Sequence, residues 1–121
     1  MLTYVLNDNG EPVAEPNISK WAEWFQFANR SVANEYIGDS RISTVFLGVD
    51  HSFGITLDDG PVIWETMVFG GLLDGEQDRC NGDRARAEEM HRRMISRVAC
   101  RLRCVGNGNG SGKRKEGLNN G

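Results

Sequence analysis

The sequence predicts an α+β fold, a two-layer sandwich with two helices on one face of an antiparallel sheet of about four or five strands. Apolar residues recur at helical spacing in residues 17–28 and 83–105. Between them, residues 32–37, 41–51 and 62–69 read as strands bounded by turn residues. Strands that follow one another through short connections favour antiparallel pairing, which leaves one sheet face for the helices.

A single domain is expected over residues 1–105, followed by a flexible tail over residues 106–121. A chain of 121 residues has room for one hydrophobic core. The tail begins with a run of Gly and Asn that cannot bury enough apolar surface to become ordered. Its basic residues 113–115 are most simply interpreted as a solubilising segment.

The N-terminal segment predicts a β-hairpin over residues 2–13. Residues 2–6 are strand-like, and residues 7–10 supply Asn, Asp and Gly, which tolerate the backbone of a tight turn. Pro12 in the returning strand has no amide hydrogen to donate, so that strand should lie at an edge.

A helix capped by Asn17 or Ser19 should follow the hairpin. Its bulky residues recur at helical spacing and form one stripe: Trp21, Trp24, Phe25 and Ala28. Packing against the sheet is the simplest interpretation of this stripe, and a platform for stacking a base or another ligand is the alternative.

The strand over residues 41–51 alternates most clearly. One of its faces holds Ile42, Thr44, Phe46, Gly48 and Asp50, and the other holds Ser43, Val45, Leu47, Val49 and His51. After a loop through residues 58–61, a strand over residues 62–69 ends at Gly70-Gly71. Residues 72–82 read as a loop, and Asp83 is expected to cap the last helix.

The only two histidines of the chain, His51 and His91, lie on apolar faces. His91 falls within the apolar stripe of the last helix, which comprises Ala87, Met90, Met94, Ile95, Val98, Leu102 and Val105. A hairpin centred near Asp58 would pair residue 49 with 67, residue 47 with 69, and His51 with Glu65. These side chains would then lie on the covered face, within reach of His91.

His51, Glu65 and His91 are therefore the candidate catalytic and metal-binding residues. Two imidazoles and a carboxylate match the ligands of a catalytic zinc or ferrous site, so a divalent metal is a possible cofactor. A metal-free His–Glu pair could act as a general acid and base. The third interpretation is a buried polar network that satisfies itself and defines the strand register.

Charge and composition bear on partners and location. The chain carries −3, and the tail contributes about +2 from residues 113–116, so the body carries about −5. Such a body predicts no nucleic-acid partner. No apolar run approaches the ~18 residues of a membrane span and no signal peptide is visible, which predicts a cytoplasmic protein without a membrane partner. Cys80, Cys100 and Cys104 lack the spacing of a disulfide framework or a zinc knuckle.

Several motifs resemble a family of small uncharacterised proteins that are common in bacteriophage genomes. The resemblance covers roughly residues 2–98. Its motifs are Ile42-Ser43-Thr44-Val45-Phe46-Leu47-Gly48-Val49-Asp50-His51-Ser52-Phe53, Glu65-Thr66-Met67-Val68-Phe69-Gly70-Gly71, and Trp21-Ala22-Glu23-Trp24-Phe25 with Arg30 and Ala33. The family usually has a Tyr-Ser-Thr-Trp cap before its last helix and a Gly before its histidine. Here these places hold residues 81–84 and Met90, while His91 is kept.

The resemblance implies a phage origin and a setting in the host cytoplasm. With the small size and the lack of a standard catalytic motif, it favours a non-enzymatic accessory protein that binds a host factor or a small molecule, for example in counter-defence. One alternative is a small metal-dependent hydrolase or lyase that uses His51, Glu65 and His91. Another is a virion-associated structural protein, and edge strands would also allow a homo-oligomer.

Overall fold

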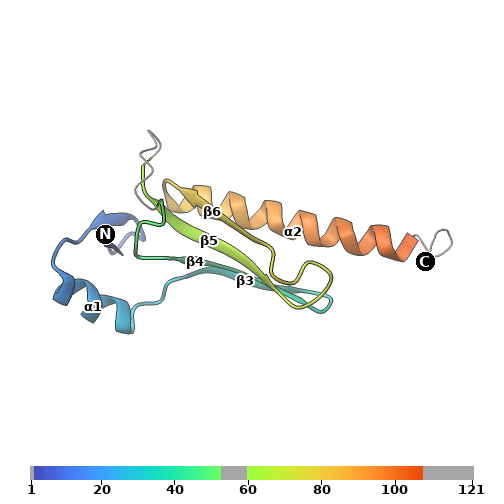
Figure 1. Cartoon of the computed structure of the whole chain (residues 1–121), viewed down its shortest axis with the longest axis horizontal. Coiled ribbons are helices and arrows are strands. Elements are labelled where there is room, and N and C mark those ends of the chain that lie inside the picture. Colours follow the sequence, from blue (N-terminus) through green and yellow to red (C-terminus); the bar gives the residue numbers. More distant parts are fainter. Residues whose placement is uncertain (1, 53–59, 108–121) are drawn as a thin grey trace.

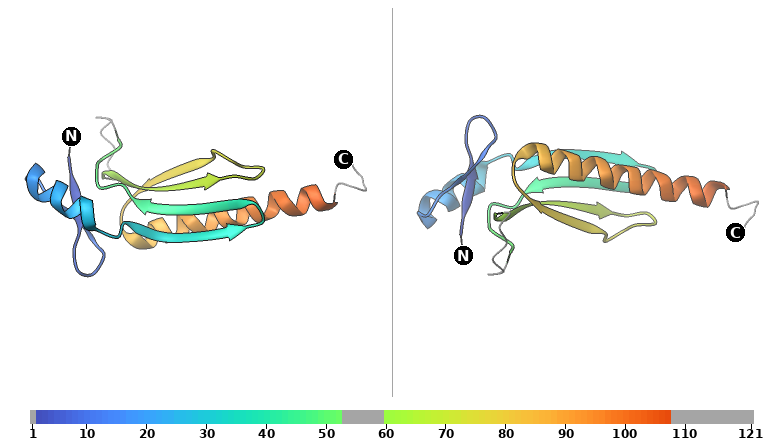
Figure 2. Two further views of the ribbon diagram at one scale, coloured as in Figure 1. Left: turned by 90° about the horizontal axis from the view of Figure 1, so that it is seen from below. Right: turned by 90° about the horizontal axis from the view of Figure 1, so that it is seen from above.

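The computed structural model describes residues 2–52 and 60–107, and it confirms the α+β sandwich. Helix α2 (Arg84–Asn107) lies across one face of a four-stranded antiparallel sheet (Figure 1). The sheet has the order β3-β4-β5-β6. Its strands are β3 (Ser31–Ile37), β4 (Ser40–Phe46), β5 (Val62–Phe69) and β6 (Gln77–Asn81). A hairpin and helix α1 (Ile18–Phe27) lie at one end of this sheet (Figure 2).

The predicted hairpin and helix cap are both confirmed. Strands β1 (Tyr4–Leu6) and β2 (Pro12–Ala14) pair antiparallel. The side chain of Asn7 closes their turn, because its Oδ1 accepts hydrogen bonds from two backbone amides within the turn. Asn17 caps α1 by accepting a hydrogen bond of 3.1 Å from the amide of Lys20.

Helix α1 packs against the end of the sheet through its aromatic stripe. The ring of Trp24 meets the ring of Phe46 edge-on with centroids 5.9 Å apart, and Trp21 donates a hydrogen bond of 3.0 Å to the Gly48 carbonyl. Gly48 has φ +75, and a Cβ there would lie 3.0 Å from the ring of Phe25. The chain therefore turns at Gly48, and β4 ends earlier than the predicted strand over residues 41–51.

The hydrophobic core lies between α2 and the sheet, and the predicted apolar stripe of α2 is confirmed at four positions. Its buried residues are Ala87, Met90, Met94 and Val98. They pack on one face of the two central strands, which is lined by Ile42, Phe46, Trp64 and Val68. The prediction that the helices cover the opposite face, with Val45 and Glu65, was wrong. Phe46 and Trp64, two large aromatic side chains, are completely buried on the face under α2.

The predicted register between the two central strands was also wrong. Val45 lies opposite Glu65, and Phe46 lies opposite Trp64. The predicted and observed registers keep the same residues together on one face, because they differ by an even number of positions. The predicted centre of the hairpin at Asp58 lies in residues 53–59, outside the described residues.

The segment predicted as a loop over residues 72–82 contains strand β6, which pairs antiparallel with β5. Its sequence, Gln-Asp-Arg-Cys-Asn, has no apolar alternation because it is an edge strand with few groups to bury. Helix α2 continues to Asn107, two residues into the segment predicted as tail, and residues 108–121 lie outside the described part of the chain. In that described part, no helix is long and apolar enough to cross a membrane.

Candidate functional site

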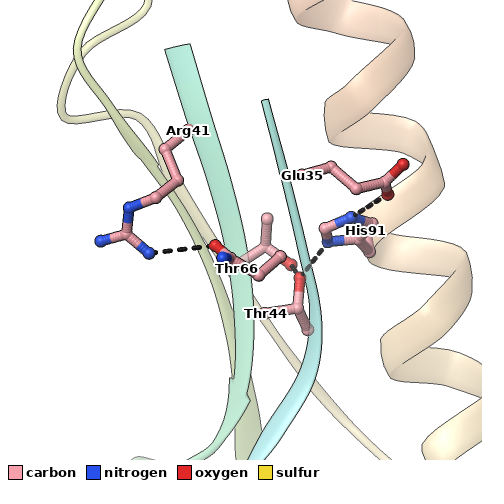
Figure 3. A network of polar contacts seen from close by, with 6 residues as sticks. Glu35, Arg41, Thr44, Thr66 and His91 are labelled. Carbon is pink, nitrogen blue, oxygen red and sulfur yellow. Dashed lines mark hydrogen bonds and ion pairs between the residues drawn. The ribbon is translucent and has the colours of Figure 1, made fainter. Parts of the chain in front are cut away.

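A polar network around His91 joins α2 to three strands of the sheet (Figure 3). The Nδ1 atom of His91 lies 2.7 Å from Oγ1 of Thr44, and its Nε2 atom lies 2.7 Å from Oε1 of Glu35. The hydroxyls of Thr44 and Thr66 are hydrogen-bonded to each other. Strands β3, β4 and β5 each contribute one residue, because Glu35, Thr44 and Thr66 all point to the face under α2.

One assignment of hydrogens satisfies every member of this network. A neutral His91 donates Nε2–H to the Glu35 carboxylate and accepts the Thr44 hydroxyl at Nδ1. Thr44 in turn accepts the hydroxyl of Thr66. The exposed carboxylate thereby sets the tautomer of a buried imidazole, as in many histidine sites.

A carboxylate, an imidazole and a hydroxyl follow one another here in the order of a nucleophilic triad. The hydroxyl, however, is sealed: Thr44 and Thr66 are completely buried and His91 is 3 % exposed. Only Glu35 reaches solvent, with 58 % of its side chain exposed. Because a nucleophile must touch its substrate, access to Thr44 would require α2 to leave the sheet. The network fits a structural role, in which it joins helix and sheet.

Glu65 lies on the other face of the sheet from His91. Its carboxylate forms an ion pair of 2.9 Å with Arg79 of β6. Arg79 is also the residue directly opposite Glu65 in the register of β5 and β6. The predicted contact of Glu65 with His91 was therefore wrong. Trp64 and Thr66 flank Glu65 and are buried under α2, so the alternation of the strand directs Glu65 away from it.

His51 lies beyond the end of β4, beside the start of β5. Its amide donates a hydrogen bond of 2.8 Å to the Val62 carbonyl, and its Nδ1 lies 2.9 Å from the Val49 carbonyl oxygen. The predicted cross-strand pair of His51 with Glu65 was wrong, because Val45 is the partner of Glu65. Among residues 2–52 and 60–107, no group of three or more His, Cys, Asp or Glu side chains could hold a metal ion.

Asp50, which the sequence did not single out as a site residue, holds the end of β4 against β5. Its carboxylate accepts hydrogen bonds from the amides of Ser52 and Val62, at 2.9 and 3.0 Å, and from the Ser52 hydroxyl. Burial opposes the ionisation of Asp50, but these hydrogen bonds and the nearby His51 outweigh it and lower its pKa. Asp50 therefore joins the segment after β4 to the start of β5 at this end of the sheet.

The face of the sheet opposite α2 forms the second candidate site, here called the open face. Figure 2 shows this face without a helix over it. Its residues, taken from the strand register, are Asn34, Tyr36, Arg41, Ser43, Val45, Glu65, Met67, Phe69, Gln77 and Arg79. No protein-family model, curated protein or solved structure matches this chain.

Three large side chains cross the open face in one row. Tyr36, Arg41 and Phe69 lie directly opposite one another on β3, β4 and β5. Tyr36 is 72 % exposed and Phe69 is 42 % exposed. The guanidinium of Arg41 lies 4.3 Å from the centre of the Phe69 ring and donates a hydrogen bond of 3.1 Å to Asn34. This row was not predicted from the sequence, because Phe69 was expected on the covered face and the alternation of residues 32–37 is too short to indicate which face Tyr36 occupies.

Proposed function

We propose that this protein is a non-enzymatic binding module whose open face holds a partner protein. The exposed row of Tyr36, Arg41 and Phe69 is the observation on which the proposal rests. Tyrosine and arginine are the residue types that dominate the energy of protein interfaces, and phenylalanine is enriched there. Two exposed aromatic side chains in one row of a sheet have no role in the core, since the core lies on the other face.

The side chain of Arg41 is fixed in one conformation by its neighbours on the open face. Its stacking on Phe69 and its hydrogen bond to Asn34 fix the side chain before a partner arrives, so little rotamer entropy is lost on association. The next row of the open face holds Asn34, Ser43, Met67 and Gln77, and the row after it holds Val45 and the ion pair of Glu65 with Arg79. Aromatic and arginine side chains next to smaller polar and apolar residues are common in protein interfaces.

A protein is favoured over a small molecule as the occupant of this face. Small ligands need a concave site that buries most of their surface, whereas a sheet face offers a broad and open one. Arg41 favours a partner that places a carboxylate opposite it, next to an apolar group over Phe69. The resemblance to phage proteins supports a host protein in the host cytoplasm as this partner, with counter-defence as one example.

The hydrolase or lyase alternative requires His51, Glu65 and His91 to act together. Glu65 is separated from His91 by the sheet, and the network of His91 is sealed, so we do not propose that activity. No contact among the described residues favours a virion-associated role over binding.

A photo-crosslinker placed at Tyr36 tests the proposal in the host cell. A matched crosslinker at Phe27, which is 80 % exposed on α1, serves as the control. We expect an adduct with one host protein from position 36 and none with that protein from position 27. The captured protein is then purified and its affinity for the chain is measured by calorimetry.

Tyr36→Ser and Phe69→Ser should each weaken that affinity at least about tenfold, as removal of an interface hot spot does. Phe27→Ser should leave the affinity unchanged, and thermal unfolding should show that all three variants are folded. The proposal is overturned by the absence of any adduct from position 36, or by equal losses of affinity in the Phe27 and Phe69 variants.

A further inference from the structure

Helix α2 concentrates positive charge in an acidic protein. It contains seven arginines, no lysine and only two acidic residues, Glu88 and Glu89, which gives the helix +5 with His91 neutral. The whole chain carries −3, so the residues outside α2 carry −8. The helix is therefore net positive and the remainder of the chain net negative, a distribution that the overall net charge conceals.

The arginines after Glu89 form the surface of interest, here called the arginine face. It consists of Arg92, Arg93, Arg97, Arg101 and Arg103, all of which are exposed. Arg92, Arg93 and Arg97 line a shallow hollow on the helix together with Ser96 and the carboxylate-bearing Glu89. No acidic residue occurs in α2 beyond Glu89.

Few carboxylates neutralise the arginine face. Glu89 pairs with Arg92 at 2.8 Å and with Arg93 at 3.5 Å, and Glu76 pairs with Arg97 at 3.4 Å. These exposed ion pairs contribute little to the stability of the protein. A phosphate group can therefore replace the carboxylates as the partner of these arginines. Within residues 2–52 and 60–107, Arg101 and Arg103 have no ion-pair partner.

We propose that the arginine face of α2 binds the phosphate backbone of nucleic acid. The use of arginine throughout is informative, because the planar guanidinium matches two phosphate oxygens at once, whereas lysine acts as a point charge. Arg93, Arg97 and Arg101 follow one another at four-residue spacing, about 6 Å apart along the axis of the helix. A series of such groups along the length of a helix suits a linear polyanion.

The shape of the molecule limits where a polyanion can approach. Leu102 lies against Gly38 in the turn between β3 and β4, and the last turn of α2 projects past this end of the sheet (Figure 1). Phosphates can therefore contact the end of α2, where no carboxylate of residues 2–52 and 60–107 pairs with Arg101 or Arg103. The sequence-based expectation of no nucleic-acid partner rested on the averaged charge of the body, which includes this helix.

An anionic membrane fits the arginine face less well. A helix that lies in a membrane surface buries an apolar face in the lipid. Met90, Met94 and Val98 of α2 are buried against the sheet and are not available to lipid, and among the described side chains of α2 Leu102 is the large apolar one that is exposed. This inference does not depend on the proposed function, because the open face and α2 lie on opposite sides of the sheet.

Fluorescence anisotropy with a labelled 20-base-pair DNA duplex and the full chain tests the inference. We expect binding without sequence preference that weakens steeply as salt increases from 50 to 200 mM. The combined substitutions Arg93→Gln, Arg97→Gln and Arg101→Gln should lower the affinity at least about tenfold and reduce the logarithmic salt dependence by about one unit per arginine. Lys20→Gln on α1, which also removes an exposed positive charge, should change neither quantity.

Several results would overturn the inference. They are no duplex binding at 50 mM salt, undiminished binding by the triple variant, and loss of binding only when residues 113–115 are changed to Gln. Tighter binding to phosphatidylserine vesicles or to polyglutamate at the same salt would assign the arginine face to a lipid or to an acidic protein instead. Circular dichroism should show that the triple variant is folded, since all three arginines are exposed. The Tyr36→Ser variant should bind DNA normally, which separates failure of this inference from failure of the proposed function.

Discussion

His91 illustrates how a buried imidazole can be accommodated in an apolar interface. Glu35 is hydrogen-bonded to one ring nitrogen and Thr44 to the other, so neither nitrogen is left without a partner. A network of this kind adds specificity, because α2 can satisfy it only in one position over the sheet. The position of His91 among Met90 and Met94 thus has a structural explanation that does not require catalysis.

Replacing Thr44 by valine should lower the free energy of unfolding by about 1–3 kcal/mol. Valine keeps the shape of the side chain but leaves Nδ1 of His91 and the hydroxyl of Thr66 without their partner. Glu35→Gln should lower the free energy of unfolding by less than about 1 kcal/mol. The amide oxygen of Gln can still accept a hydrogen bond from Nε2 of His91, and the side chain of Glu35 is partly in solvent. Urea denaturation of both variants measures the difference, and equal losses would contradict this account of the network.

At the scale of elements, the Gly70-Gly71 pair holds the end of β5 against the turn between β3 and β4. Both glycines have positive φ, +82 and +77. A Cβ at Gly70 would lie 2.6 Å from the carbonyl oxygen of Asp39, and one at Gly71 would overlap Oγ of Ser40. Ser40 also donates a hydrogen bond to the Gly70 carbonyl. The pair is required for this close approach of two turns, in addition to ending the strand.

Gly70→Ala should destabilise the protein more than Gly75→Ala. Both residues have positive φ, so each alanine pays the strain of that backbone, about 1–2 kcal/mol. At Gly75 no atom lies within 4 Å of the added Cβ, whereas at Gly70 the backbone of Asp39 must move. Thermal unfolding should show a loss of about 4–8 °C for each kcal/mol, with the larger loss for Gly70→Ala. Equal shifts in melting temperature would show that the contact with Asp39 is not restrictive.

For the whole molecule, the core under α2 and the N-terminal hairpin with α1 differ in how firmly they are held. Both clusters of buried apolar residues lie between α2 and the sheet. The hairpin is joined to the end of the sheet by backbone hydrogen bonds from Tyr4 to Gly48 and from Asp50 to Leu2. Helix α1 has no fully buried residue, and Trp24 joins it to the core by its contact with Phe46.

Hydrogen exchange should therefore begin in the N-terminal part of the chain. Amides of β1, β2 and α1 are expected to exchange at least about tenfold faster than those of β4 and β5, because local opening there exposes little buried surface. Trp24→Ala should accelerate exchange in α1 and leave β5 unchanged, since the contact with Phe46 is lost. Mass spectrometry of deuterated peptides measures both effects, and uniform protection along the chain would contradict this division.

Local signals in the sequence determined much of the secondary structure. The hairpin turn at Asn7, the cap at Asn17, the bounds of β5 and the buried stripe of α2 with His91 all followed from residue types at short spacing. Turn chemistry, capping and periodicity act over a few residues, so they can be recognised without the fold. The edge strand β6 was missed because it buries too little to show a pattern.

Only the tertiary structure decided which face of the sheet is covered and which polar residues meet. The alternation in β4 and β5 permits either face to be buried, and several registers keep the same residues together. Which face is covered depends on the total apolar surface that Phe46, Trp64 and their neighbours bury under α2. That total includes residues far apart in the sequence, so it cannot be read from any single strand. That choice placed Glu65 away from His91 and left Tyr36, Arg41 and Phe69 exposed on the open face.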